Sequence, residues 1–366
     1  MLDWGVTLNL KKGNDSRDDL NIKIFVELMK TITPDITNIL ETRYSILRII
    51  NYLQPIGRRN LSNKLGLSER NIRTEASVLK KQGLIEITSE GMNITPLGKN
   101  TIEKFKIVFH NLRGINELEK RVENIIKIKK VIVVPGSVES DELVFKEIGR
   151  AAANYLKNQI KEDSIIGLTG GTTMAHVVEE YGKNEREGFK NTIIVPARGG
   201  LGKKVEYQAN TLVQKLANKM NSRYKLLYTP DYLSKDAINS LMNEPIIREI
   251  MDYITKLDIL VFGIGRADVM AKRRGLDKSK IEDLLQREAV SEAFGYYFND
   301  SGEILHEIST IGIKLEQYKN MENIIAVAGG SDKAESIMAI SKLNKNLVLI
   351  TDESAAKKII LKYKEE

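Results

Sequence analysis

Two glycines followed by two hydroxyl residues, Gly170-Gly171-Thr172-Thr173, have the composition of an anion site. An apolar run, 165–168, precedes them and a helical pattern follows, so the glycines are predicted to open a helix. The first turn of a helix has unpaired N–H groups and a partial positive charge, which attract phosphate. Glycine lets the main chain approach a ligand closely, and threonine adds hydroxyl donors. A tight strand-to-helix turn without a ligand is the alternative interpretation.

The same plan recurs near the end of the chain. The apolar run 324–328 leads into Gly329 and Gly330, and then into Ser331 and Lys333 at the start of a second helical pattern. Two such anion sites indicate a ligand with two phosphates.

Two further apolar runs between these turns also break into glycine and a charged residue. One run leads to Arg198-Gly199-Gly200, and the other leads through Gly263-Ile264-Gly265 to Asp268. This order predicts an α/β domain with a doubly wound, mostly parallel sheet whose ligand groups follow the carboxyl ends of its strands. Neither glycine pair fits the dinucleotide fingerprint, so a Rossmann dehydrogenase is excluded.

Composition narrows the class of protein. The 366-residue chain is long for one core and suggests two domains with a connector. It contains no cysteine, which excludes disulfides and thiolate metal sites, and its three histidines lie far apart, so neither a metal nor a cofactor is expected. No apolar stretch approaches the roughly 18 to 20 residues of a membrane span, and no signal peptide is recognisable. A cytoplasmic protein without a membrane partner is expected.

Positive charge is concentrated in one short segment. Residues 55–82 contain seven Lys or Arg against two Glu, within a chain of net charge +7. A short helix is predicted over 58–65, followed by the turn Gly66-Leu67-Ser68 and a second helix from Glu69. Alternating residues over 84–95, around a glycine, predict a hairpin. The sequence therefore predicts a winged helix-turn-helix, with a solvated basic helix beside a hairpin as the alternative.

The second helix has one apolar face and one polar face. Ile72, Ala76 and Leu79 recur at helical spacing and are expected to face the core. The opposite side chains can meet phosphates and base edges in a major groove. The helix has no aromatic residue on which single-stranded RNA would stack, so double-stranded DNA is the favoured partner. The predicted DNA-binding residues are Arg58, Arg59, Ser68, Arg70, Asn71, Arg73, Thr74, Ser77 and Lys81.

The predicted organisation has four parts. They are a leader of unknown role (1–33), the DNA-binding domain (34–98), a helical connector (99–130) and the ligand domain (131–366). The connector has a narrow apolar stripe close to a heptad, which suits a homo-oligomer, dimer or tetramer, that places two DNA-binding domains on one operator. Packing of this stripe on the chain's own ligand domain is the alternative.

Several segments together resemble one family. They are Pro55-Ile56-Gly57-Arg58-Arg59, Leu65-Gly66-Leu67-Ser68-Glu69-Arg70, Gly170-Gly171-Thr172-Thr173-Met174, Val195-Pro196-Ala197-Arg198-Gly199-Gly200 and Glu292-Ala293-Phe294-Gly295-Tyr296-Tyr297-Phe298. The chain, from about residue 36 to 358, resembles the sorbitol-operon-type (SorC) family of sugar-responsive regulators, in particular its branch that controls central glycolytic genes in Gram-positive bacteria. The leader lies outside this likeness.

The resemblance implies a repressor of glycolytic genes whose effector is fructose-1,6-bisphosphate or a related sugar phosphate. It also implies an effector domain similar to glucosamine-6-phosphate deaminase and ribose-5-phosphate isomerase.

The resemblance further implies roles for individual residues. Gly170, Gly171, Thr172 and Thr173 would hold one phosphate with help from Arg198, Gly199 and Gly200, and Lys333 beside Ser331 would form the second cationic site. Gln208, Asp268 and Glu292 would contact sugar hydroxyls.

Four of these residues also have an alternative interpretation. Arg198 suits a phosphate contact or a surface salt bridge, and Asp268 suits a sugar contact or a helix cap. Glu292 could equally be a helix-end carboxylate. Gln208, on a helical stretch over 205–220, is more often exposed than functional in such a position.

A phosphosugar isomerase or deaminase fused to a DNA-binding domain is the competing function. Its chemistry needs a positioned base near C1–C2 of the sugar, for which Asp268 or Glu292 would be available. The family's enzyme relatives place a histidine after the corresponding Gly-x-Gly turn, whereas this chain has Arg266 and Ala267 there. The protein is therefore predicted not to be an enzyme.

Overall fold

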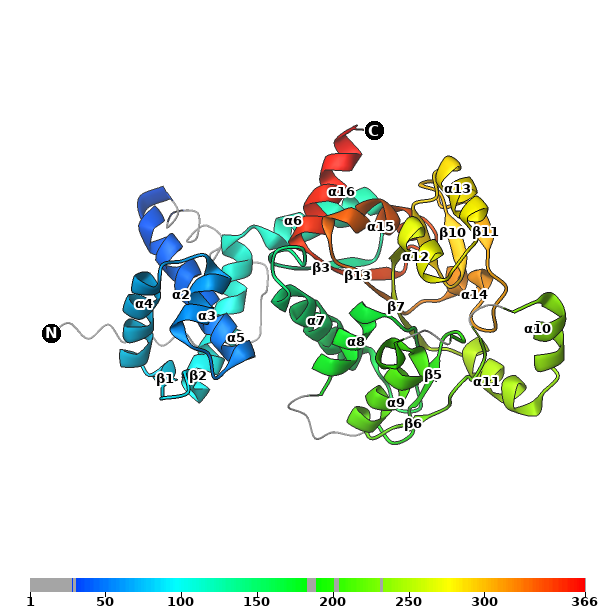
Figure 1. The fold of residues 1–366 in the computed structure, drawn as a ribbon, viewed down its shortest axis with the longest axis horizontal. Helices are drawn as coiled ribbons and strands as arrows, with labels where there is room; N and C mark the ends of the chain where they lie inside the picture. Colours follow the sequence, from blue (N-terminus) through cyan, green and yellow to red (C-terminus); the bar gives the residue numbers. More distant parts are fainter. Residues whose placement is uncertain (1–27, 29–30, 183–188, 201–203, 231–232, 366) are drawn as a thin grey trace. The chain divides into compact units, whose positions relative to one another are not determined.

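The computed structural model describes residues 28, 31–182, 189–200, 204–230 and 233–365. Figure 1 shows the chain, which divides into two compact units, Met1–Asn116 and Glu117–Glu366. The division falls inside the segment predicted as the connector. Most of the predicted leader, 1–33, lies outside the described residues.

The first unit contains four helices and a hairpin among its described residues. The elements are α2 (Pro34–Leu53), α3 (Arg58–Leu65), α4 (Glu69–Lys81), β1 (Ile85–Ile87), β2 (Met92–Ile94) and α5 (Pro96–Leu112). Helix α2 has Pro34 in its first turn and buries Tyr44, Ile46, Leu47, Ile49 and Ile50. Strands β1 and β2 pair antiparallel, and Ile56 adds a bridge to Met92.

Packing between α2 and α5 completes the core of the first unit. The Tyr44 ring of α2 lies 4.4 Å from the Phe109 ring and 5.4 Å from the Phe105 ring of α5, measured between centroids. Ile72, Ala76 and Leu79 of α4 are buried, as the helical spacing predicts. Aromatic and aliphatic burial of this kind supplies most of the driving force for a small domain.

The second unit begins within α6 (Ile115–Ile126) and is built on a seven-stranded sheet. Its strand order is β3-β13-β12-β7-β4-β5-β6, and every neighbouring pair is parallel. The strands are β3 (Lys130–Val134), β4 (Ile165–Leu168), β5 (Ile193–Pro196), β6 (Arg223–Tyr224), β7 (Ile259–Gly263), β12 (Ile324–Val327) and β13 (Leu347–Asp352). The predicted mostly parallel α/β sheet is confirmed.

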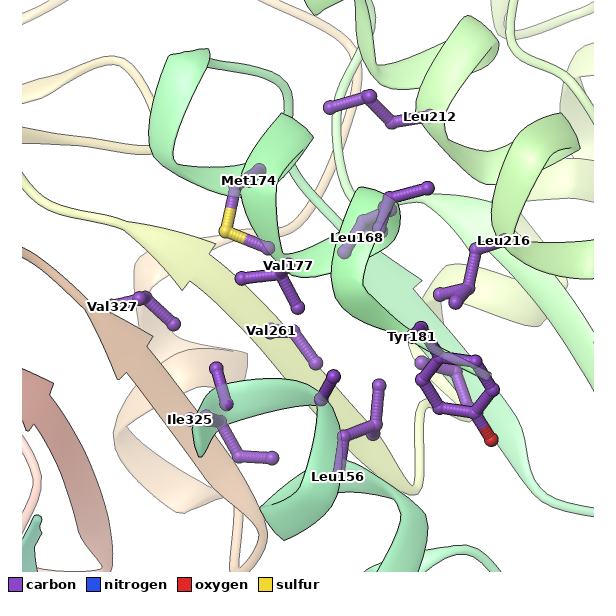
Figure 2. Packing of buried hydrophobic residues seen from close by; sticks show 14 of the residues in the cluster. Leu156, Leu168, Met174, Val177, Tyr181, Leu212, Leu216, Val261, Ile325 and Val327 are labelled. Carbon is purple, nitrogen blue, oxygen red and sulfur yellow. The ribbon is translucent and has the colours of Figure 1, made fainter. Parts of the chain in front are cut away.

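Three helices bury one face of this sheet. The helices are α7 (Leu143–Gln159), α8 (Thr172–Glu180) and α9 (Ala209–Met220). Figure 2 shows Leu156 of α7, Val177 of α8 and Leu216 of α9 meeting Val261 and Ile325 of the sheet. Strands with both faces covered consist of nearly continuous apolar runs, which is why β4, β7 and β12 were recognisable in the sequence.

The order of the strands creates a switch point beside β4. From β4 the chain proceeds outward to β5 and β6, and it then returns to the other side of β4 as β7. Loops leaving neighbouring strands in opposite directions open a crevice at the carboxyl end of an α/β sheet, where ligands bind. The Gly170–Thr173 segment follows β4 and therefore lies at this crevice.

A second, antiparallel sheet follows directly from the end of β7. Its order is β11-β10-β9-β8, with β8 (Gly265–Arg266), β9 (Ser291–Ala293), β10 (Tyr296–Phe298) and β11 (Ile304–Glu307). Because β8 pairs with β9, Gly265 lies opposite Glu292. This sheet brings residues distant in sequence to the carboxyl end of the large sheet.

The remaining helices connect these strands. They are α10 (Lys235–Leu241), α11 (Pro245–Thr255), α12 (Ala267–Arg273), α13 (Lys278–Gln286), α14 (Leu315–Asn320), α15 (Ala334–Ser341) and α16 (Glu353–Glu365), with 3-10 turns η1 (Val205–Tyr207) and η2 (Ser331–Lys333). Among the described residues, no helix is long and apolar enough to cross a membrane.

Candidate functional site

The first glycine turn, Gly170–Thr173, is shaped by close backbone approach. Gly170 packs against η1 so tightly that a Cβ atom there would lie 2.7 Å from the Tyr207 carbonyl oxygen. Gly171 has φ of +124° and is the N-cap of α8, and no side chain caps this end of the helix. The Gly171 N–H donates to the Tyr207 carbonyl at 2.8 Å. Both positions therefore require glycine, and α8 presents its first turn at the switch point.

Three further predicted residues belong to this turn or lie beside it. Thr172 is exposed, Thr173 is buried, and Gln208 immediately follows the Tyr207 carbonyl. The expected continuous helix over 205–220 is wrong, because Gln208 is the extended N-cap residue between η1 and α9. That break directs residues 207–209 against Gly170 and so brings Gln208 to the edge of the first turn.

The second glycine turn, Gly329–Lys333, follows β12. The N–H of Gly330 donates to Oδ1 of Asp352 at 3.0 Å. The N–H and Oγ of Ser331 both donate to Oε1 of Glu139, at 2.8 and 2.6 Å. Carboxylates of the protein thus take donors that the sequence analysis assigned to a ligand.

Lys333 is the cation of the second turn. Its side chain is half-buried, and within the described part of the chain its ammonium group makes no hydrogen bond or salt bridge. Burial lowers the pKa of the Lys333 ammonium group, although Asp332 and Asp352 oppose that effect. A half-buried cation without a paired anion is electrostatically costly, so an incoming anion would be stabilised here.

Arg266 is the last residue of β8, which follows β7, the strand between β12 and β4. It donates to both carboxylate oxygens of Asp268, at 3.1 and 2.8 Å, and to Asp332 at 2.9 Å. Burial raises the pKa of the Asp268 carboxyl, but the hydrogen bonds and charge of Arg266 outweigh burial and hold that pKa below its ordinary value. The N-cap of α12 is Arg266, so Asp268 is not the helix cap that was considered.

Arg198 and Glu292 meet on the other side of the first turn. Both are buried, at 7% and 4% exposure, and Nη1 of Arg198 lies 3.5 Å from Oε1 of Glu292. The same oxygen accepts from Arg274 at 2.8 Å and from the Gly295 N–H at 2.7 Å. The surface salt bridge considered for Arg198 is therefore wrong. The helix-end position considered for Glu292 is also wrong, because Glu292 belongs to β9.

Loops beside β5 hold Arg198 in place. Gly199 donates its N–H to Ile311 at 2.9 Å, and Arg198 forms an isolated bridge with Gly312. Gly199 is buried and Gly200 half-buried. Apart from Gln208 and Glu292, the predicted residues of the ligand domain thus follow the ends of adjacent strands, in the order β12, β7, β4 and β5.

Four residues of this region were not predicted as site residues from the sequence. They are Glu139, Arg266, Arg274 and Asp352. Asp352 had a usable signal, since it ends the apolar run 347–351 in the same way that Arg198 follows β5. Glu139 and Arg274 had none, because their partners lie far away in the sequence.

The predicted nucleic-acid interface lies on the first unit. Helix α3 ends at Gly66, and α4 begins after Ser68, whose Oγ accepts the Asn71 N–H at 3.2 Å. The nine predicted DNA-binding residues are all exposed: Arg58, Arg59, Ser68, Arg70, Asn71, Arg73, Thr74, Ser77 and Lys81. In addition, Arg43 of α2 pairs with Glu75 of α4 at 2.6 Å and fixes the orientation of α4.

Two hydroxyl groups on this surface already have partners. Ser68 caps α4, and the Thr74 hydroxyl donates to the Arg70 carbonyl at 3.1 Å. Among the described residues, the side chains of Arg70, Arg73 and Lys81 make no hydrogen bond or salt bridge. They are therefore the groups of α4 best placed to meet a polyanion.

Comparison with known protein families supports this division. The family model described as "Putative sugar-binding domain" matches residues 110–361, and the model described as "CggR N-terminal DNA binding domain" matches residues 39–109. The two matches correspond closely to the two units of the structure.

Similar whole proteins are transcriptional regulators. The central glycolytic genes regulator of Priestia megaterium is 39% identical over 340 residues, which are 93% of this chain and 99% of that protein. That of Bacillus subtilis is 39% identical over 335 residues, 92% of this chain and 98% of that protein.

A solved structure agrees with these relatives. It is described as the putative SorC family transcriptional regulator from Enterococcus faecalis and is 37% identical, with a TM-score of 0.62, over 67% of this chain and 99% of that one. The relatives and matched domains belong to regulators, so the prediction that this protein is not an enzyme is confirmed. The chain belongs to the central glycolytic genes regulators, within the SorC family of transcriptional regulators.

Proposed function

We propose that this protein represses glycolytic genes by binding operator DNA, and that fructose-1,6-bisphosphate binds its second unit and weakens this repression. The arrangement of the two glycine turns is the observation that carries the proposal. They follow β4 and β12, which are separated by β7 alone. Neighbouring strands lie 4.7–4.9 Å apart, so the two turns are separated by about 10 Å. A hexose with phosphates at both ends matches that separation.

The first phosphate is assigned to the first glycine turn. Helix α8 has no side-chain cap, and Gly171 and Thr172 leave its first turn accessible to an anion. Backbone N–H groups and the helix dipole then stabilise a phosphate. Arg198, which follows the adjacent strand β5, adds a guanidinium group from the side.

The second phosphate is assigned to Lys333 and Ser331. The Lys333 ammonium group makes no hydrogen bond or salt bridge in the described chain, and Ser331 supplies an N–H and a hydroxyl group. A phosphate in this position would favour the charged form of Lys333, whose pKa burial lowers. Gln208, Asp268 and Glu292 are left to contact the sugar hydroxyls between the turns.

Operator binding is assigned to the first unit as a winged helix-turn-helix. Helix α4 would enter the major groove, with Arg58 and Arg59 on the flanking phosphates and the β1–β2 hairpin as the wing. A homo-oligomer would place two such units on one operator, and the effector acts by favouring one assembly over another through differential binding. The ligand unit is proposed to share the phosphosugar isomerase and deaminase fold.

The decisive experiment measures operator binding during an effector titration. Gel shifts with the operator fragment should show weaker cooperative binding as fructose-1,6-bisphosphate is added, whereas fructose at the same concentrations should have no effect. Binding that stays constant over the full titration would refute the proposal. Thermal shifts with mono- and bisphosphorylated sugars identify the preferred ligand, since binding to the folded state raises the unfolding temperature.

A further inference from the structure

Glu139 contacts the second glycine turn in a way that resembles a bound anion. Its Oε1 accepts from both the N–H and the hydroxyl of Ser331, at 2.8 and 2.6 Å. These are the two donors that a phosphate beside Lys333 would use. Glu139 itself is exposed and forms no salt bridge within the described residues.

Asp352, the other carboxylate of this turn, is held quite differently. It is fully buried, and its oxygens accept from Gly330, Val138, Ser354 and Ala355 at 2.8–3.1 Å. Removing such a carboxylate would leave several buried donors unsatisfied, so Asp352 is structural. Within the part of the chain that the structure describes, the Glu139 carboxylate accepts only from Ser331 and, over a long 3.5 Å, from Ser137 Oγ, so it is the carboxylate that can leave.

Two hydrogen bonds hold the backbone beside Glu139 independently of its side chain. The N–H of Val138 donates to Asp352 at 2.9 Å, and that of Gly136 donates to Glu353 at 2.9 Å. Rotation of the exposed side chain alone is thus enough to free Ser331, and no loop movement is needed.

We infer that Glu139 is an intramolecular competitor for the second anion position, so that its carboxylate must rotate away before the second phosphate of the effector binds. This inference rests on the proposed function, because it concerns the ligand site assigned there. A sugar with one phosphate bound at the first turn does not need Ser331, and Glu139 does not affect it. Glu139 therefore sets the affinity for bisphosphates separately from that for monophosphates.

The size of the effect follows from the fraction of time for which Ser331 is free. The apparent dissociation constant equals the intrinsic one divided by the competent fraction. If Glu139 occupies Ser331 about nine-tenths of the time, Glu139→Ala tightens binding of fructose-1,6-bisphosphate about tenfold. Glu139→Gln, which keeps an acceptor but loses the charge, should fall between wild type and Glu139→Ala.

The test is isothermal titration of the full chain with fructose-1,6-bisphosphate and with fructose 6-phosphate. Glu142→Ala is the matched control, because Glu142 is an exposed carboxylate of the same loop whose side chain does not cap α7. We expect Glu139→Ala to bind the bisphosphate about tenfold more tightly. Fructose 6-phosphate affinity and the Glu142→Ala variant should stay within about twofold of wild type. Thermal unfolding confirms that each variant folds. If Glu139→Ala does not fold, Glu139→Gln replaces it in the titrations.

Other outcomes overturn the inference. Unchanged bisphosphate affinity in Glu139→Ala means that the carboxylate does not compete, and weaker affinity means that it contacts the ligand. If Glu142→Ala binds the bisphosphate equally more tightly, the effect comes from removing a negative charge near the site and not from competition for Ser331. The wild-type protein is titrated before any variant. If it binds no sugar phosphate, both the proposed function and this inference are refuted.

Discussion

In the proposed function, Lys333 is the residue on which the preference for a bisphosphate depends most directly. Its ammonium group is half-buried beside the second glycine turn and makes no hydrogen bond or salt bridge among the described residues. A methionine has a similar volume but no charge.

Lys333→Met is therefore predicted to weaken fructose-1,6-bisphosphate binding by about 10- to 100-fold, the range of about 1.4 to 2.8 kcal/mol that one charge-assisted contact contributes. Fructose 6-phosphate binding should change much less, and isothermal titration separates the two. Lys345→Met, which removes an exposed lysine near the opposite end of β13, is the control. Equal losses for both sugars would place Lys333 outside the second phosphate position.

A substitution at Gly171 changes the backbone conformation of the first glycine turn without introducing a steric clash. A Cβ atom at this position would meet no atom within 4 Å, but the backbone φ of +124° is a conformation that residues with a side chain rarely adopt. Gly171→Ala is predicted to cost about 1–3 kcal/mol of stability and to weaken phosphate binding. Urea unfolding and titration with fructose 6-phosphate measure the two effects. An unchanged unfolding midpoint would contradict the strain argument.

At the scale of elements, α4 is the helix of the first unit that we propose to contact DNA. Its apolar side faces the core through Ile72, Ala76 and Leu79, and the Arg43–Glu75 pair fixes it against α2. The opposite side exposes Arg73 near the middle of the helix. A mutation there should affect DNA contacts without disturbing the core.

Arg73→Ala is predicted to weaken operator binding and to lower the slope of log affinity against log salt by about 1 if the side chain contacts a phosphate. Fluorescence anisotropy at several salt concentrations gives both quantities. Lys104→Ala, which removes an exposed charge from α5, should leave the slope unchanged. Loss of effector affinity in Arg73→Ala would indicate misfolding instead.

Helix α6 covers the free edge of the large sheet with carboxylates. Strand β3 lies at the edge of the sheet, and its Val131 and Val133 N–H groups donate to Glu123 and Glu119 instead of to another strand, each at 2.8 Å. Burial raises the pKa of Glu119 from 4.5 to about 7, with a smaller contribution from the charge of Glu123, although the hydrogen bond from Val133 opposes the shift. Covering an edge in this way also discourages pairing with other chains.

A raised acid pKa in the folded state makes stability fall as pH increases. The folded protein binds the Glu119 proton more tightly than the unfolded chain does, so this contribution is present below pH 4.5 and is lost as pH rises through about 7. The difference corresponds to up to about 3 kcal/mol. Glu119→Gln keeps an acceptor for the Val133 N–H without titrating.

Compared with wild type, Glu119→Gln should unfold at a similar temperature near pH 5 and at a higher temperature near pH 8, as measured by calorimetry. The histidines contribute equally to both proteins, so the difference isolates Glu119. Parallel pH profiles would contradict the pKa shift.

At the scale of the whole molecule, regulation requires the two units to be coupled. If fructose-1,6-bisphosphate weakens operator binding by some factor, operator DNA must weaken fructose-1,6-bisphosphate binding by the same factor. Titrating the sugar into the free protein and into the operator complex is predicted to give that factor. In Arg73→Ala, operator added at the same concentration should have little effect on sugar affinity. Unequal factors at equilibrium would mean that the measured species differ in assembly.

The amino-acid sequence alone predicted the parallel sheet and the edge at which the candidate residues lie. Continuous apolar runs ending in glycine predicted β4, β5, β7 and β12, because strands buried on both faces must be apolar throughout. The helices α3 and α4 and the turn between them followed from caps and helical spacing, which are local properties. The residues after each strand could be assigned to one edge because parallel strands all end on the same side.

Only the tertiary structure decided which groups meet at that edge. The small antiparallel sheet brings Glu292 to Arg198, 94 positions away, and Arg274 to the same carboxylate. Glu139 reaches Ser331 across 192 positions. No spacing rule encodes such contacts, since strand order and sheet pairing, rather than local propensity, bring these segments together. Long-range pairing of charges depends on the folded topology, and for that reason the competing carboxylate was invisible in the sequence.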